Sequence, residues 1–390
     1  MSDDSLNFLA QPPLPSKLGR YRQLAPRAGV HISPIILGGM SIGDKWEKMG
    51  MGCMNRESSF KLLDAFYQAG GNAIDTANFY QDGSSEEFIG EWMEERGIRD
   101  QIFIMTKYTN NARMGKPPCF GQKIMYTGNN IKSMHISVEE SLKRLRTDYI
   151  DLFYVHWWDY TTTVEEVMDG LHNLVVQGKV LYLGISDTPA HIVSEANTYA
   201  KYNGKTPFVV YQGEWSVMNR DFEREMLPVA RRHGMAICPW NVLASGRIRT
   251  DEEEERRRQS GEGGRTLFGT KWERNENEKK MAKALEQVAK DVGAKHITSV
   301  AIAYVMQKSP YVFPVIGGRK VEHLMNNLEA LDIALKPEHI AFIESVIPFD
   351  LGFPYTFFED DYNVWYKTAG HVDKWPTSQA IRPSTQIRGC

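Results

Sequence analysis

The sequence has 390 residues, of which 42% are hydrophobic, 24% charged and 11% aromatic. This composition is typical of a folded globular protein and excludes wholesale disorder. The 46 basic and 49 acidic residues give a net charge of −3 without a polybasic block, so nucleic acid is not expected as a primary partner. At about 150 residues per domain, the length suits two to three domains or one large barrel, and the pattern along the chain must decide.

Cysteine usage and the start of the chain bear on the compartment. Cys53, Cys119, Cys238 and Cys390 form no Cys-x-x-Cys pair, which indicates neither a disulfide framework nor a zinc site, and no metal is expected. Residues 1–17 are acidic and then proline-rich, unlike a secretory signal, and no apolar run reaches the roughly 20 residues that cross a bilayer. We therefore expect a cytoplasmic protein with no membrane partner.

After an N-terminal extension over 1–17, residues 21–33 predict a short hairpin that plugs the bottom of a barrel, with its turn near Pro26 to Gly29. Eight apolar runs follow. They are nearly continuous rather than alternating, as expected for parallel strands that are buried on both faces. The runs cover 35–39, 72–77, 102–107, 150–156, 180–186, 208–213, 235–240 and 313–317.

Segments of helical period separate the runs. Ser137 with Glu140 and Thr163 with Glu166 fit capping boxes, and Thr188 before Pro189 fits a cap followed by the first helical position. Apolar residues spaced on one helix face are Phe60, Leu63 and Tyr67, and then Val164, Val167, Leu171 and Leu174 before Gly178.

Strand and helix alternate eight times, which predicts an α/β protein with a (β/α)8 TIM barrel over residues 18–347. The alternative is a doubly wound open sheet. It would normally carry GxGxxG after its first strand, but the chain has LGGMSIGDKW there and no GxxxxGK(S/T) anywhere. The barrel is therefore favoured.

Two long loops and a tail extend this barrel. Residues 109–131 and 245–272 both follow strands, so both should lie over the C-terminal face, where barrel active sites are found. The charge run within 251–258 indicates a solvated helix face or, as a second interpretation, a clasp over a ligand. The tail, 348–390, is expected to pack across the barrel mouth or into a subunit contact because it is rich in aromatics: Phe349, Phe353, Tyr355, Phe357, Phe358, Trp365 and Trp375.

Four polar residues lie at or just past neighbouring strand ends: Asp75, Tyr80, Lys107 and His156. Each has a structural alternative, such as Asp75 binding backbone amides, Tyr80 lying on the rim, or His156 only packing. Together they suit proton transfer. An ammonium near a tyrosine, whose ordinary pKa is about 10, favours the phenolate and so makes a usable general acid and base. Asp75 can hold Lys107, His156 can donate to a substrate oxygen, and such a site fits the reduction of a carbonyl.

The order of motifs resembles the aldo-keto reductase superfamily over essentially the whole chain. It comprises GxxIDTAxxYxxGxSEExIG, a strand ending in TK, DLFYVHWWD, GISD, YQ and PVIGGRKVEHLMNN. Longer stretches, such as PWNVLASGRIRTDEEEERR and SGEGGRTL, are similar to fungal aryl-alcohol dehydrogenases and to the norsolorinic acid reductases of polyketide pathways. The resemblance implies that Asp75, Tyr80, Lys107 and His156 are the catalytic tetrad.

The resemblance also implies NADPH or NADP+ in extended form on the C-terminal face. Ser186, Asp187 and Gln212 would hold the carboxamide, and Trp240 would stack on the nicotinamide. The other implied contacts are Gly39, Met40, Asp75, Asn241, Val242, Leu243, Ala244, Ser245, Gly246, Arg247, Arg265, Gly317, Arg319, His323, Asn326 and Asn327.

Charge favours NADP(H) over NAD(H). Arg319 and Lys320 lie where a 2′-phosphate would arrive, and Glu322 is the one acidic residue close by in the sequence. A surface ion pair is the structural alternative for Arg319.

Two departures from the superfamily pattern are Asp187, where many members have Asn, and Trp157 with Trp158, where many have a proline after the histidine. Tyr80, His156 and Trp157 are the expected substrate contacts.

The resulting hypothesis is an NADP(H)-dependent enzyme, monomeric or homo-oligomeric, that interconverts aryl aldehydes and aryl alcohols. One alternative is the same chemistry on one aromatic ketone of fungal secondary metabolism. A second is a cofactor-binding regulatory subunit. A glycosidase is disfavoured because no second strand-end carboxylate is placed to face Asp75.

Overall fold

The computed structural model describes residues 12–47, 53–261, 271–358, 369–371, 373 and 378–383. Eight parallel strands form one sheet in the order β10-β3-β4-β5-β6-β7-β8-β9. They are β3 (Ile36–Gly38), β4 (Ala73–Asp75), β5 (Phe103–Tyr108), β6 (Ile150–Val155), β7 (Val180–Ser186), β8 (Phe208–Glu214), β9 (Ala236–Trp240) and β10 (Val315–Gly317). Each predicted run coincides with one strand to within two residues.

The sheet closes on itself between β9 and the residues just before β10. The Ile237 amide donates to the Tyr311 carbonyl at 2.9 Å, and the Phe313 amide donates to the Ile237 carbonyl at 2.8 Å. A parallel bridge joins Ile237 and Val312. The predicted TIM barrel is therefore confirmed.

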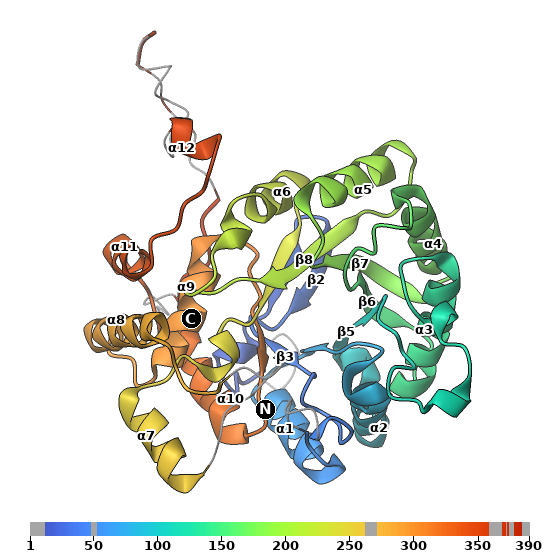
Figure 1. Ribbon diagram of the computed structural model, residues 1–390, viewed down its shortest axis with the longest axis horizontal. Helices are drawn as coiled ribbons and strands as arrows, with labels where there is room; N and C mark the ends of the chain where they lie inside the picture. The colour runs from blue at the N-terminus through green and yellow to red at the C-terminus, as the bar shows by residue number, and fades with distance from the viewer. Residues whose placement is uncertain are drawn as a thin grey trace, which may run out of the picture.

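Helices surround the barrel (Figure 1). The barrel helices are α1 (Arg56–Gln68), α2 (Ser84–Arg96), α3 (Ile131–Leu145), α4 (Val164–Val176), α5 (Ala190–Tyr202), α6 (Met226–His233), α9 (Ile297–Lys308) and α10 (Val321–Asn327). The additional ones are α7 (Asp251–Ser260), α8 (Glu276–Val292), α11 (Pro337–Val346) and α12 (Tyr355–Phe358). Helix α9 is buried almost all round because it lies between the barrel and the outer helices.

The N-terminal hairpin plugs the barrel as predicted. Strands β1 (Arg22–Ala25) and β2 (Ala28–Ile32) pair antiparallel. Leu24 and Ile32 are fully buried in one cluster with barrel-lining residues such as Leu152. The turn is shorter than expected, since Gly29 already belongs to β2.

Two predicted helix starts are wrong. Ser137 lies inside α3, which begins about two turns earlier with Asn130 as its cap, and Ser137 accepts a hydrogen bond from the Asn78 side-chain amide. Thr188 donates to the Ser186 carbonyl instead of capping α5. Thr163 does cap α4, as predicted. Both errors arise because a serine or threonine whose position fits a helix cap can use its hydroxyl in another contact, with Asn78 for Ser137 and with the nearby backbone for Thr188.

The described part of the tail runs along the outside of the barrel. Phe349 lies 4.6 Å from the Arg224 guanidinium, whose Nη2 donates to the Asp350 carbonyl at 2.8 Å. Phe353 is 84% exposed, and α12 lies outside the ring of barrel helices (Figure 1), where the Tyr355 hydroxyl donates to Glu225 Oε1 at 3.2 Å. The described tail residues therefore pack on the outside of the barrel beside Arg224 and Glu225 rather than across its mouth, and the alternative expectation of a subunit contact stays a prediction. Trp365 and Trp375 lie outside the described residues.

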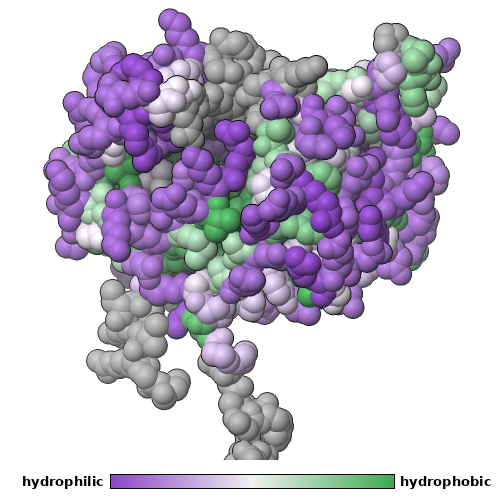
Figure 2. All heavy atoms as spheres, turned by 90° about the horizontal axis from the view of Figure 1, so that it is seen from below, coloured by the Kyte–Doolittle hydropathy of each residue, from purple (hydrophilic) through white to green (hydrophobic). Residues whose placement is uncertain are grey.

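Hydrophilic residues dominate the side of the molecule that is seen from below, and hydrophobic residues occur there in small groups (Figure 2). Among the described residues, no helix is long and apolar enough to cross a membrane.

Candidate active site

The inward-facing positions of the strands converge at the C-terminal end of the barrel. Side chains alternate along a strand, so residues two apart point the same way. Leu152 and Tyr154 belong to the interior cluster, and His156 continues their series. The same alternation brings Asp75, Lys107, Ser186, Gln212 and Trp240 to one end of the barrel lumen.

Lys107 and Asp75 form a buried ion pair. Lys107 Nζ lies 2.6 Å from Asp75 Oδ1 and also donates to the Thr76 carbonyl at 2.7 Å. The lysine side chain has no exposed surface, and that of the aspartate is 3% exposed. Burial lowers the pKa of Lys107, and the Asp75 carboxylate opposes this by favouring the charged ammonium. The pair thus holds a positive charge at a fixed point.

Tyr80 comes from the loop after β4, and its ring centroid lies 5.1 Å from Lys107 Nζ. The backbone turns sharply behind it, with Gln81 and Asp82 both at φ of 53°. The buried Gln81 side chain fixes this turn by accepting from the Trp46 amide at 2.8 Å. The loop therefore places the Tyr80 ring beside the Lys107 ammonium.

His156 follows β6 directly, and its ring centroid lies 5.9 Å from that of Tyr80. Burial, and then the nearby Lys107 charge, hold the pKa of His156 well below its ordinary value. The imidazole is therefore neutral near pH 7, and its Nδ1 lies 2.8 Å from Asn110 Nδ2. The prediction did not include Asn110, although its place just past the third barrel strand was a usable signal.

Gln212 supports the buried ion pair, a contact that the sequence did not predict. Its Nε2 donates to Asp75 Oδ2 at 2.9 Å, so the carboxylate is held by an ammonium on one oxygen and an amide on the other. Asp187 accepts from Trp240 Nε1 at 3.1 Å and from the Ser186 hydroxyl at 3.0 Å. Desolvation by the surrounding barrel wall raises the pKa of Asp187 to about 6, although its side chain is open to the mouth.

The turn after β9 has a strained backbone, with three residues other than glycine at positive φ. Asn241, Ala244 and Ser245 have φ of 57°, 47° and 54°. Asn241 Nδ2 donates to Glu214 Oε1 at 2.6 Å, which ties the turn to β8. A Cβ built on Gly246 would meet nothing within 4 Å, so a ligand can approach that backbone closely. The remaining predicted residues of the turn are Val242, Leu243 and Arg247; Val242 is buried.

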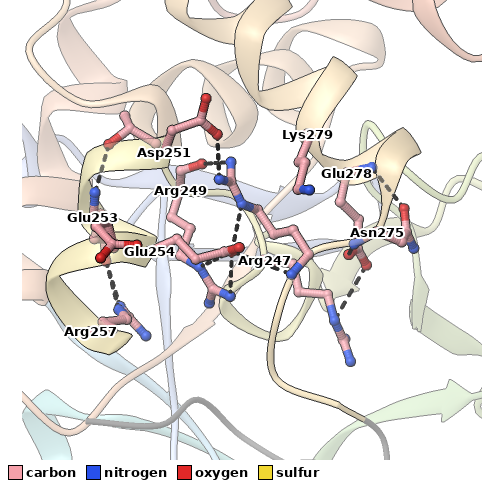
Figure 3. A network of polar contacts seen from close by, with 12 residues as sticks. Arg247, Arg249, Asp251, Glu253, Glu254, Arg257, Asn275, Glu278 and Lys279 are labelled. Atoms are coloured by element: carbon pink, nitrogen blue, oxygen red, sulfur yellow. Dashed lines mark hydrogen bonds and ion pairs between the residues drawn. The ribbon is translucent and has the colours of Figure 1, made fainter. Parts of the chain in front are cut away.

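Behind this turn lies a network of buried charges (Figure 3). Glu254 Oε2 accepts from Arg249 Nη2 at 2.9 Å and from Arg274 Nε at 2.8 Å. Arg249 Nη1 in turn donates to the Gly246 carbonyl at 2.9 Å. The exposed side of α7 is a solvated face, as expected, with pairs such as Arg258 on Glu255. Glu254, however, points inward and fastens α7 to the turn, and the charge pattern alone did not reveal this. Arg265 lies outside the described residues.

The residues predicted for the adenosine end lie at β10 and α10. Gly317, Arg319 and His323 are exposed, whereas Asn327 is 6% exposed and offers little surface to a ligand. The Asn326 carbonyl accepts from the Ser299 hydroxyl at 3.0 Å. In the described part of the chain, Arg319 forms no ion pair. The structural alternative for Arg319, a surface ion pair, is therefore not seen among these residues.

Gly39 and Met40 pack under the site. A Cβ on Gly39 would lie 2.8 Å from the Asp75 carbonyl oxygen, so the close approach of β3 to β4 requires glycine here. The Met40 carbonyl accepts from Gln81 Nε2 at 3.0 Å, which also supports the Tyr80 loop.

The two tryptophans after His156 differ. Trp158 is 7% exposed and packs in the core, while Trp157 is 42% exposed, with its ring 5.3 Å from that of His156.

A hollow of about 610 Å³ opens beside Asp187 and is lined by Tyr160, His191 and other residues. Among the described residues, no group of three or more His, Cys, Asp or Glu side chains is placed to hold a metal ion.

Comparisons with known proteins agree with this geometry. The sequence model of the aldo/keto reductase family matches residues 34–348. The chain is 65% identical to an aryl-alcohol dehydrogenase, NADP(+), of Phanerodontia chrysosporium, covering 95% of this chain and 98% of that protein. It is 54% identical to the putative aryl-alcohol dehydrogenase AAD14 of Saccharomyces cerevisiae (91% and 93% covered) and 49% identical to norsolorinic acid reductase A of Aspergillus parasiticus (96% and 93% covered).

Proposed function

The chain belongs to the aldo/keto reductase family, and on that premise we propose that it is an NADP(H)-dependent oxidoreductase that interconverts aryl aldehydes and aryl alcohols. The 65% identity to an aryl-alcohol dehydrogenase over nearly the full length of both chains supports this substrate class. We also propose a cytoplasmic location, because the spacing of the four cysteines does not indicate a disulfide framework, as is usual in a reducing compartment.

The observation that carries the proposal is the convergence of four side chains at the barrel mouth. Lys107 Nζ is 2.6 Å from Asp75 and 5.1 Å from the Tyr80 ring centroid, and the His156 ring centroid lies 5.9 Å from that of Tyr80. A structural role for each residue alone does not require an ammonium buried beside a tyrosine.

The residues present fit a nicotinamide dinucleotide. Asp187 and Gln212 offer an acceptor and an amide near the barrel axis, and Trp240 offers an aromatic face beside them. The backbones of Gly246 and Gly318 are open to close approach, since a Cβ on either would meet nothing within 4 Å. When bound, NADPH supplies the hydride for carbonyl reduction.

The side chains handle the proton and the substrate oxygen. His156 and Tyr80 bind the carbonyl oxygen and orient the carbon toward the hydride donor. Tyr80 then gives its phenolic proton to the developing alkoxide, and the Lys107 ammonium stabilises the phenolate that remains. Asp75 holds the ammonium in place. In the oxidative direction, the phenolate takes the proton back from the alcohol.

Substrate and cofactor preference follow from two exposed groups. Trp157 lies at the mouth beside His156 and offers a stacking surface to an aromatic ring. Arg319 is exposed and can bind a 2′-phosphate bidentately, which favours NADP(H).

A dedicated ketone reductase of secondary metabolism is the second candidate, favoured by the 49% identity to norsolorinic acid reductase A. The identity to the aryl-alcohol dehydrogenase is higher, and we therefore place aryl aldehydes first. A regulatory subunit without activity would not need Lys107 beside Tyr80.

The test is NADPH oxidation with methoxylated benzaldehydes and with a polycyclic aromatic ketone, for the wild type and Tyr80→Phe. We expect aldehyde turnover by the wild type and a loss of at least about 100-fold in kcat for the variant. Tyr202→Phe is the matched control, since Tyr202 is 77% exposed at the end of α5. Turnover of the ketone alone would favour the second candidate, and an unchanged rate in Tyr80→Phe would remove Tyr80 as the acid.

A further inference from the structure

The imidazole of His156 can serve the reaction in only one of its two neutral forms. Neutral histidine carries a proton on one ring nitrogen and a lone pair on the other. A nitrogen that binds the carbonyl oxygen of a substrate must carry the proton, because a lone pair would face the lone pairs of that oxygen. The position of one proton therefore decides whether His156 assists the reaction.

Asn110 contacts one of these nitrogens. Its Nδ2 lies 2.8 Å from His156 Nδ1, and both side chains are buried, at 5% and 7% exposure. An amide nitrogen can only donate, so Nδ1 must accept. In the described part of the chain, Nδ1 is the ring nitrogen that has a hydrogen-bond partner, which leaves Nε2 for a substrate.

The surrounding loop fixes Asn110 in this place. Asn78 Nδ2 donates to the backbone carbonyl of Asn110 at 3.4 Å and to the Ser137 hydroxyl at 3.2 Å. On the preceding residue, Thr109 Oγ1 accepts from the His156 amide at 3.3 Å. The backbones of Asn110 and His156, which carry the amide and the imidazole, are thus each held by a hydrogen bond.

We propose that Asn110 is a positioning residue that fixes His156 as the Nε2–H tautomer, so that Nε2 donates to the carbonyl oxygen of the substrate. The inference rests on the proposed function of the site. The lowered pKa of His156 agrees with it, because burial and the Lys107 charge keep the ring neutral, and only a neutral ring has a choice of tautomer.

The first measurement is long-range ¹H–¹⁵N correlation NMR of the histidine-labelled protein at pH 7, which distinguishes both tautomers and the cation. The His156 signal is assigned by its loss in His156→Gln. We expect Nε2–H in the wild type. In Asn110→Asp a carboxylate faces Nδ1, so we expect a proton on Nδ1. An Nδ1–H tautomer in the wild type, or an unchanged ring in Asn110→Asp, would overturn the proposal.

The second measurement is activity. Asn110→Leu and Asn110→Asp should each lower kcat/KM for an aryl aldehyde about 10-fold or more, the effect of one hydrogen bond to a reacting oxygen. The Kd of NADPH should stay within about twofold, which also reports that the variants fold. Asn111→Asp is the matched control: its Oδ1 accepts from the Arg113 amide at 2.9 Å, and the aspartate keeps this contact.

The two measurements separate the two proposals. If the wild type turns over no aryl aldehyde but the ring is Nε2–H and responds to Asn110→Asp, the proposed function fails and the positioning role stands. If aldehyde turnover is normal and Asn110→Leu retains the wild-type rate, the positioning role is wrong.

Discussion

Glu254 offers the sharpest test of how the barrel mouth is held together. It accepts hydrogen bonds from Arg249 and Arg274, and each of these guanidinium side chains is only 2% exposed. Glu254→Gln keeps the size of the side chain but removes the negative charge to which both guanidinium groups donate. Breaking a buried ion pair by removing one partner costs about 3–5 kcal/mol. In the variant, Arg274 still pairs with Asp251, and Arg249 still donates to two backbone carbonyls. We therefore expect the free energy of unfolding to fall by about 3 kcal/mol, the lower end of that range.

Urea unfolding at pH 7, followed by fluorescence and by circular dichroism, measures this loss. The matched control is Glu255→Gln, because Glu255 pairs with Arg258 on the exposed side of the same helix and is 51% exposed. It should change the free energy of unfolding by less than about 0.5 kcal/mol. Since Arg249 also donates to the Gly246 carbonyl, NADPH should bind Glu254→Gln about 3-fold to 10-fold more weakly.

The pH dependence has a defined sign. Burial alone would raise the pKa of Glu254, but the hydrogen bonds from Arg274 and Arg249 lower it below the ordinary value of 4.5. A lowered carboxyl pKa contributes stability that is present above pH 4.5 and is lost as the pH falls through the native pKa. The difference between wild type and Glu254→Gln should therefore shrink in acid. Equal stability of the two proteins at pH 7, or an equal loss in Glu255→Gln, would refute the account of the network.

Three further predictions concern the site itself. Lys107→Met should lower kcat at least about 100-fold, measured by stopped-flow NADPH oxidation, because the phenolate then forms without an ammonium beside it; a loss below tenfold would contradict this role. The Kd of NADPH should rise as the pH falls below about 6 in the wild type but not in Asp187→Asn, because the ionised carboxylate accepts from the carboxamide more strongly than the protonated carboxyl does. Comparing the two proteins removes the effect of titrating the cofactor phosphates, which is the same in both. If the Kd depends on pH in the same way in both proteins, Asp187 does not contact the carboxamide. Trp240→Leu should raise the Kd of NADPH about 10-fold by loss of stacking, as measured by fluorescence titration; an unchanged Kd would place the nicotinamide elsewhere.

The strands could be predicted from the sequence because burial on both faces leaves a continuous apolar run, as in residues 150–155. The convergence of Asp75, Lys107 and His156 followed from the alternation of side chains and the common direction of parallel strands. In both cases a local pattern and a general rule about barrels were sufficient.

Other features depend on contacts that no local pattern encodes. Ser137 matches a helix cap in its spacing, but in the structure it lies within α3 and accepts from Asn78. Glu254 belongs to a charge run whose other members are mostly solvated, and only the fold shows that it is buried between Arg249 and Arg274. The contact of Asn110 with His156 joins a loop to a strand end 46 residues later.

The central claim is that Tyr80 protonates the oxygen of an aryl aldehyde while hydride reaches the carbon. Single-turnover reduction with NADPH deuterated at C4 of the nicotinamide, compared between the wild type and Tyr80→Phe, tests it most directly. The account predicts deuterium on the carbinol carbon of the alcohol, and a hydride-transfer rate at least about 100-fold lower in the variant. Transfer at the wild-type rate by Tyr80→Phe, or an alcohol without deuterium, would contradict it.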